Sequence, residues 1–260
     1  MTLEDERACM APLQLAGQLI VESGGEIYRV EETITRMGRA LGLRDVDSFA
    51  VPSGVFISYR LSDGTVETAV RRLHPGATDL ERIDRVNSVS RRIEEGTLTL
   101  AQASAELEAI RDERKPVRRW QPLAAWICAS GFSLLFGGGV AEFLLSGAVA
   151  ALVELLCEGL NRARAQSMFI TLIGGLVSAL VPMAAALLWK DLNTAPTIAG
   201  ALMPLLPGLA MTNAVQDTVR GDMVAGLSHG MSALLTACLA AGGALVAAAL
   251  FLRLTGGGAV

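Results

Sequence analysis

The sequence predicts an α-helical membrane protein, with five transmembrane helices preceded by a small cytoplasmic α+β domain. The charges are divided unevenly, because only five of the 22 Lys and Arg residues and six of the 26 Asp and Glu residues lie in residues 120–260. That second part contains five apolar stretches long enough to cross a bilayer. The first part has the charged composition of a soluble domain.

The predicted domain over residues 1–115 begins with helical and then strand patterns. Residues 11–43 carry apolar side chains at helical spacing, interrupted at Gly24–Gly25. This interruption fits either a simple break between two helices or the close approach of another backbone or a ligand. Residues 47–73 alternate apolar and polar side chains and contain Asp63–Gly64, a strong hairpin signal. A helical region followed by strands is therefore expected.

Two more helices complete this domain, at about 78–95 and 99–114, and Thr99 has the character of an N-cap. The near-neutral charge of the first part gives no indication of nucleic-acid binding. No nucleotide-binding loop, nucleophile motif or dinucleotide fingerprint is present. His74 and His229 are the two histidines, and neither has a partner at metal-ligand spacing. We therefore expect no enzyme activity, no metal and no cofactor.

Residues 116–260 are predicted to form the transmembrane domain. A stretch of roughly 20 mostly apolar residues can span a bilayer. The five spans are expected at about 121–139, 141–160, 168–189, 195–213 and 226–252. Lys and Arg gather in the connections on one side, before the first span and between the second and third. The N-terminal domain is therefore expected in the cytoplasm and the C-terminus outside.

The apolar stretches are rich in small residues, which let helices approach closely. The glycines concerned include Gly131, Gly137–Gly139, Gly174–Gly175 and Gly242–Gly243. Internal packing and an interface with another chain are both consistent with this pattern.

One polar stretch, residues 205–226, stands out within the apolar half. Pro207 removes a backbone donor and is followed by Gly208, so the helix is expected to break there. Broken helices are tolerated at membrane depth where they are buried in protein or line a watery cavity, and transporters use them to bind ions and carboxylates. After the break, helical spacing places four polar residues on one face: Asn213, Gln216, Asp217 and Arg220.

Ordinary structural roles also account for these residues. Asp222 is suited to cap the fifth span. Asp217 and Arg220 can form a solvated ion pair in a cytoplasmic loop. In the second span, Glu154 and Glu158 share a helix face, and they either pair with nearby arginines or form a proton or cation site. The residue pattern alone leaves these alternatives open.

Five segments, taken in order, carry a resemblance to a known family. They are "ESGGEIYRVEETI" (22–34), "VPSGVFIS" (51–58), "RRLHPGATDLERIDRVNSVSRRIEEGTLTLAQA" (71–103), "GFSLLFGGG" (131–139) and "LPGLAMTNAVQDTVRGDMVAGLSHG" (206–230). On these segments the chain resembles the threonine/serine exporter (ThrE) family. It is similar to the YjjP-type polypeptides, which correspond to the N-terminal half of the full-length members. The resemblance covers nearly the whole chain.

The resemblance implies an inner-membrane secondary exporter subunit of a bacterium. Its substrate would be a small carboxylate metabolite, either threonine/serine or a dicarboxylate such as succinate. The chain looks like half a transporter, which a YjjB-type membrane subunit would complete within the lipid bilayer. A regulatory subunit, or a membrane-anchored hydrolase-like subunit, is the alternative function.

The resemblance also favours a functional role for the polar stretch. Its motif positions include Pro207, Gly208, Asn213, Asp217, Gly221 and Asp222. As a hypothesis, the break at Pro207–Gly208 opens backbone groups toward a cavity, and Asn213 and Asp217 lie at its cytoplasmic mouth. Arg220 would attract the substrate carboxylate, while Asp217 or Glu154 would carry a coupling proton if burial raises its pKa.

Overall fold

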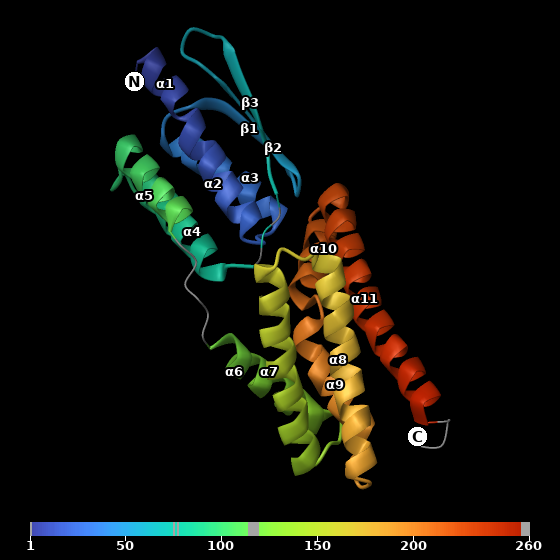
Figure 1. Cartoon of the computed structure of the whole chain (residues 1–260). Coiled ribbons are helices and arrows are strands. Elements are labelled where there is room, and N and C mark those ends of the chain that lie inside the picture. The colour runs from blue at the N-terminus through green and yellow to red at the C-terminus, as the bar shows by residue number, and fades with distance from the viewer. Residues whose placement is uncertain (1, 75, 77, 114–119, 256–260) are drawn as a thin grey trace. The chain divides into compact units, whose positions relative to one another are not determined.

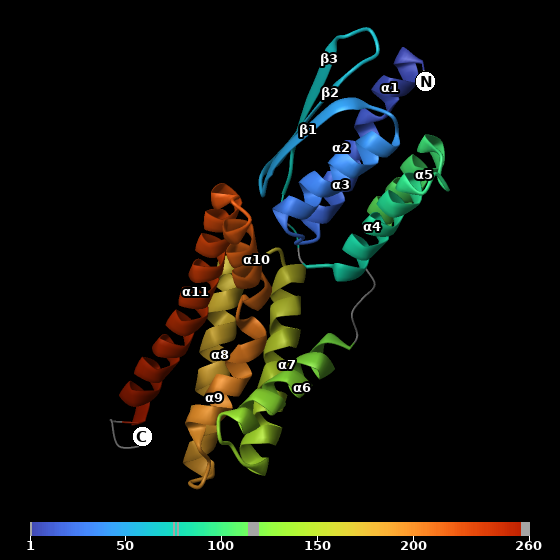
Figure 2. The ribbon, with the colours of Figure 1, turned by 180° about the vertical axis from the view of Figure 1, so that it is seen from behind.

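The structure is a computed structural model that describes residues 2–74, 76, 78–113 and 120–255 (Figure 1, and Figure 2 from behind). The chain forms two compact units. The first unit comprises Met1–Lys115 together with Leu209–Met231, and the second comprises Pro116–Gly208 together with Ser232–Val260. A short segment from late in the sequence therefore folds with the N-terminal part of the chain, and the predicted domain over residues 1–115 does not include it.

The first unit begins with three helices, α1 (Leu3–Ala8), α2 (Met10–Glu22) and α3 (Ile27–Ala40). The break that the sequence predicts at Gly24–Gly25 separates α2 from α3. Gly24 has a φ of 72°, which side-chain-bearing residues rarely adopt. The apolar residues at helical spacing are buried in one core, as the pattern predicts: Leu13, Ala16, Ile20, Ile27, Val30, Ile34 and Met37.

A three-stranded antiparallel sheet follows, in the order β1 (Arg44–Val51), β2 (Gly54–Arg60) and β3 (Val66–Arg72). Alternation along β2 buries Val55, Ile57 and Tyr59 and exposes the intervening face. The β2–β3 connection is the hairpin expected from Asp63–Gly64, closed by a hydrogen bond from the Leu61 amide to the Thr65 carbonyl. The buried Tyr59 hydroxyl donates to the Glu6 carbonyl at 2.9 Å, which ties β2 to α1.

Helices α4 (Leu80–Glu94) and α5 (Leu100–Asp112) complete the N-terminal part. The Thr99 side chain accepts the Gln102 amide in a capping box, which confirms the predicted N-cap of α5. Both views show α2 and α3 between the sheet on one side and α4 and α5 on the other (Figures 1 and 2). The connection before the first predicted span, which is rich in Lys and Arg, lies largely outside the described residues.

The remaining helices contain the candidate membrane spans: α6 (Gln121–Leu135), α7 (Val140–Arg162), α8 (Ser167–Leu188), α9 (Thr194–Leu202), η1 (Met203–Leu205), α10 (Gly208–Val219) and α11 (Met223–Thr255). Among the described residues, α7, α8 and α11 are long and apolar enough to cross a membrane. A fourth span results if α9, η1 and α10 count as one broken span. The helix is thus interrupted around Pro207, as the sequence predicts.

The expectation of five spans is not confirmed. The first of them corresponds to α6, which has only 15 residues. At 1.5 Å per residue such a helix is about 22 Å long, shorter than the roughly 30 Å hydrocarbon core. The helix ends early because the chain turns at Gly137, and the predicted span had included the residues of that turn.

Small residues serve internal packing at several positions of the second unit. A Cβ at Gly175 would overlap the Ala240 carbonyl, and one at Gly243 would overlap the Leu172 carbonyl. Helices α8 and α11 therefore approach with almost no side chain between their backbones. By contrast, a Cβ at Gly131 would meet no atom within 4 Å.

Candidate functional site

Residues 209–231, which belong to the first unit, fold as a helical hairpin. Gly221 has a φ of 96°, which turns the chain after α10. Asp222 follows, and its Oδ1 accepts the Ala225 amide at 3.0 Å. Asp222 is therefore the N-cap of α11, which is the structural alternative that the sequence left open. At the hairpin contact Gly226 faces Thr218, and a Cβ there would overlap the Thr218 side chain.

The hairpin buries one carboxylate against one histidine. Asp217 is fully buried, and its Oδ2 lies 3.0 Å from His229 Nδ1. The Asp217 Oδ1 atom makes no hydrogen bond of good geometry within the described residues, although the Ile27 amide at the start of α3 lies near the carboxylate. A buried carboxylate is unfavourable unless it is paired or protonated. The alternative in which Asp217 and Arg220 form a solvated ion pair is therefore wrong.

The same face of the hairpin contacts the break between α2 and α3. Asn213 Nδ2 donates to the Gly24 carbonyl at 3.1 Å. The Arg220 guanidinium lies 3.7 Å from the centre of the Tyr28 ring, in cation–π geometry. The Gly24–Gly25 interruption is therefore a break between two helices, and another backbone also lies close to it, since a Cβ at Gly24 would be 3.4 Å from the Thr78 Cα.

A second carboxylate, Glu31 on α3, belongs to the same electrostatic environment. Its Oε1 accepts the Ala50 amide at 2.8 Å. Burial raises the pKa of Glu31, and the negative charges of Asp222 and Asp217 raise it further, while the Ala50 hydrogen bond opposes the shift. We call Glu31, Asp217, Asp222 and His229 the carboxylate cluster. Within the described part of the chain, no three His, Cys, Asp or Glu side chains are placed to hold a metal ion.

Glu31→Gln is expected to stabilise the protein at neutral pH and not at pH 4. The folded state raises the Glu31 pKa, so it favours the protonated carboxyl and loses stability as the pH rises through that pKa. Glutamine keeps the acceptor for Ala50 and removes the charge. The check is the thermal midpoint of both proteins in detergent from pH 4 to pH 8. A variant that is less stable than wild type at pH 7 would contradict the sign.

The structure brings together part of the predicted site. Asn213, Asp217 and Arg220 lie together on the hairpin, whereas the fourth member of the predicted stripe, Gln216, is exposed. Pro207, Gly208 and Glu154 belong to the second unit.

The two carboxylates of α7 that the sequence singled out, Glu154 and Glu158, differ in their ion pairing. Glu158 pairs with Arg162 at 2.6 Å, as the structural alternative predicts. Glu154 is half-buried and forms no ion pair within the described residues. Near the start of the same helix, Glu142 is buried and accepts the amides of Gly139 and Asn193, each at 2.8 Å. Glu142 therefore holds the beginning of α7 to the residue before α9.

Sequence reasoning missed His229, Tyr28 and Glu31. His229 was set aside because no metal ligand stood at the usual spacing, but its partner Asp217 is 12 residues away across a turn. Gly221 and Asp222 were the available signal, because a glycine followed by an N-cap residue is typical of a tight connection between helices.

The apolar helices, the broken α9–α10 pair and the charged α+β unit together define a multi-pass membrane protein. The model of the ThrE family, described as "Putative threonine/serine exporter", matches residues 13–251. The chain therefore belongs to this family. The match includes both segments that meet in the candidate site.

Curated relatives agree with this assignment. The chain is 26% identical over 231 residues to the "Probable threonine/serine exporter" of Mycobacterium tuberculosis, which covers 86% of this chain but only 43% of the relative. It is 25% identical over 236 residues to the "Probable succinate transporter subunit YjjP" of Escherichia coli, covering 88% of this chain and 89% of the relative. The protein of the same description from Klebsiella aerogenes is 26% identical over 217 residues, covering 81% of each chain. No solved structure matches.

Proposed function

We propose that this chain is one subunit of a secondary exporter of small carboxylate metabolites. The observation that carries the proposal is the family match over residues 13–251 together with helices able to span a membrane. The substrate is threonine and serine or a dicarboxylate such as succinate, since the relatives carry both descriptions. These metabolites share a carboxylate, which is the group that an arginine or a helix N-terminus binds.

A partner subunit completes the proposed transporter. The chain spans less than half of the Mycobacterium tuberculosis relative but most of the Escherichia coli relative, which is described as a subunit. We infer that a YjjB-type membrane protein supplies the missing part. We place the complex in the bacterial inner membrane. The first unit's α+β part lies in the cytoplasm, because the connections on the same side of the membrane as this part are rich in Lys and Arg.

The carboxylate cluster gives this proposal a mechanism. Asp217 is fully buried with its Oδ2 3.0 Å from His229 Nδ1, so a proton on either group is shared across a hydrogen bond and the pair is suited to take up and release one. Arg220 lies one helical turn further on and offers a positive charge to a substrate carboxylate, and Asn213 ties the same helix face to Gly24. Pro207 and Gly208 interrupt the helix before this region, and Glu154 is the second candidate for the proton.

Metabolite accumulation in cells that lack this chain tests the proposal. Intracellular threonine, serine and succinate are compared in those cells, in cells rescued with wild type and in cells rescued with Asp217→Ala. If one of these metabolites accumulates in the cells that lack the chain, and only the wild-type protein lowers its level again, the result supports export and a role of Asp217 in it. Equal rescue by both proteins would remove Asp217 from the site.

The rival classes make different predictions. A regulatory subunit predicts that export survives loss of this chain with altered control. A membrane-anchored hydrolase-like subunit predicts that the purified chain cleaves members of an ester or peptide panel. The exporter descriptions of the family and its relatives favour the first proposal over both.

A further inference from the structure

One face of the three-stranded sheet packs against α2 and α3, and its other face is exposed (Figures 1 and 2). The exposed face of an antiparallel sheet normally carries polar side chains. Here its central row is apolar, because Phe49, Phe56 and Val70 lie opposite one another on neighbouring strands and are 54%, 43% and 61% exposed. The Phe49 and Phe56 ring centres are 6.0 Å apart. Such a row indicates a surface that another molecule covers.

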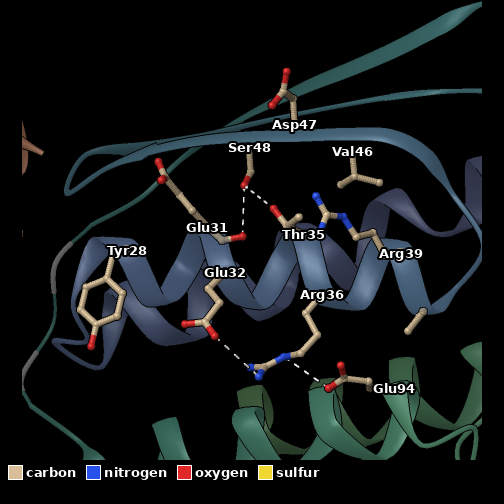
Figure 3. Close-up of a pocket in the computed structure, with 11 residues that line it drawn as sticks. Tyr28, Glu31, Glu32, Thr35, Arg36, Arg39, Val46, Asp47, Ser48 and Glu94 are labelled. Carbon is tan, nitrogen blue, oxygen red and sulfur yellow. Dashed lines mark hydrogen bonds and ion pairs between the residues drawn. The ribbon is translucent and has the colours of Figure 1, made fainter. Parts of the chain in front are cut away.

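Two charges without an ion pair flank this apolar row. Asp47 on β1 lies opposite Ser58, two residues after Phe56 along β2. Arg72 on β3 lies opposite Gly54, two residues before Phe56. Both charged side chains are exposed, and neither forms an ion pair within the described residues. Figure 3 shows Asp47 pointing away from α3, on the open side of the sheet. A negative and a positive charge therefore lie at opposite corners around Phe56.

This arrangement of charges is complementary to itself. A two-fold axis that passes through Phe56, in the plane between two facing copies, can place Arg72 of each copy over Asp47 of the other. The apolar rows then meet at Phe56, and the strands of the two sheets cross steeply, as in orthogonal sheet packing. A groove of about 310 Å³ beside Phe56, between Phe49 and Thr68, has room for a side chain of the other copy.

We propose that this sheet face is a contact between two copies of the chain. An apolar centre with opposite charges at symmetric positions is what an isologous contact requires. A second copy fits the face better than a lipid surface does, because Asp47 would repel the negative charge of anionic lipids. The inference does not rest on the proposed export activity, and it gives the sheet a role that no step of the export mechanism uses.

The size of the face determines how strong this contact is. With seven residues in β2, the usual strand rise and spacing give a face of about 24 Å by about 14 Å, or about 340 Å² per copy. A standard interface buries roughly 800 Å² per partner, so the sheet face alone supports a weak contact. Copies confined to one membrane meet at a high effective concentration, which favours association through a weak contact.

Thiol cross-linking of the full-length chain in isolated cell membranes tests this contact. Thr68 is exposed on the same face of the sheet, and the two-fold axis brings the Thr68 positions of the two copies close together. A short bismaleimide is therefore expected to link Thr68→Cys chains into dimers. The chain without this substitution measures the background from the native cysteines, of which Cys238 is exposed.

Charge reversal then tests whether the second molecule is another copy. Asp47→Arg and Arg72→Asp, each made in the Thr68→Cys chain, are expected to lower the dimer yield about tenfold, because each brings like charges together twice. The double variant is expected to restore the yield. Co-expression of the two single variants with different tags is expected to link one tag to the other, because every pair of facing positions again carries opposite charges.

An apolar substitution completes the test. Phe56→Ser is expected to lower the dimer yield about tenfold, because it removes the centre of the contact. Leu80→Ser is the matched control, since Leu80 is 63% exposed but lies on α4 and outside the sheet face, and it is expected to leave the yield unchanged.

Three results would overturn the proposal. The first is the absence of any dimer that depends on Thr68→Cys, and the second is a dimer yield that neither single charge reversal lowers. The third is cross-linking of Thr68→Cys mainly to a different polypeptide, which would show that a partner subunit covers the face. Loss or retention of export in cells changes none of these outcomes, so this proposal and the proposed function fail separately.

Discussion

Asp217→Asn is expected to lower export about tenfold or more and to abolish the pH dependence of the remaining rate. The side chain is fully buried, and its Oδ2 lies 3.0 Å from Nδ1 of the neighbouring His229. Asparagine keeps the shape and the acceptor oxygen but cannot take up a proton. If the Asp217–His229 pair carries the coupling proton, the substitution removes the proton-binding step while leaving the hairpin in place. Efflux of preloaded substrate from cells between pH 5.5 and 8.5 measures both effects.

Two further variants make this test specific. His229→Gln is expected to reproduce the loss, and the double variant is expected to be no worse than either single one, because both residues belong to one pair. Asp191→Asn makes the same chemical change at an exposed carboxylate and is expected to leave export unchanged. An Asp217→Asn protein with wild-type rate and pH dependence, present in the membrane in normal amount, would remove Asp217 from coupling.

Local patterns in the sequence predict the elements of the first unit well. The helical spacing of apolar residues, the alternation along β2 and the Thr99 cap each depend on residues close together in the chain. The structure bears out all three. The prediction of a span over 121–139 is not confirmed, because hydropathy depends on how many residues are apolar and not on backbone conformation. It therefore did not indicate that the chain turns at Gly137 and ends the helix.

The candidate site could be predicted only in part, because its contacts are long-range. Polarity at membrane depth singled out Asn213 and Asp217, but 189 residues separate Asn213 from Gly24. The spacing of apolar and polar residues along the sequence does not predict a contact between residues so far apart. The resemblance had named both segments as marks of one family without indicating that they touch. The sequence analysis gives no role to Tyr28 and Glu31, because the hairpin that they face is distant from them in the chain.

Gly175→Ala and Gly243→Ala are each expected to destabilise the protein by about 2 kcal/mol, the middle of the range for overpacking a close contact. Each new methyl would overlap a backbone carbonyl of the facing helix, Ala240 in the first case and Leu172 in the second. Backbone atoms cannot rotate away as side chains do, so α8 and α11 would have to separate. The loss opposes the helix-propensity gain of about 1 kcal/mol that alanine brings over glycine. Thermal midpoints in detergent, at one heating rate, measure the difference.

Gly242→Ala separates the close contact from a general effect of replacing glycine in this helix. Gly242 is adjacent to Gly243, but the nearest atom to its added Cβ is a Leu172 side-chain carbon at 3.9 Å, an ordinary contact distance. Only the higher helix propensity of alanine then changes the stability, so this variant is expected to be as stable as wild type or more stable. Opposite signs at neighbouring positions would show that the α8–α11 backbones touch where the structure places them. An equal loss at all three glycines would contradict the close contact, because an added Cβ at Gly242 meets no backbone atom of the facing helix within 4 Å.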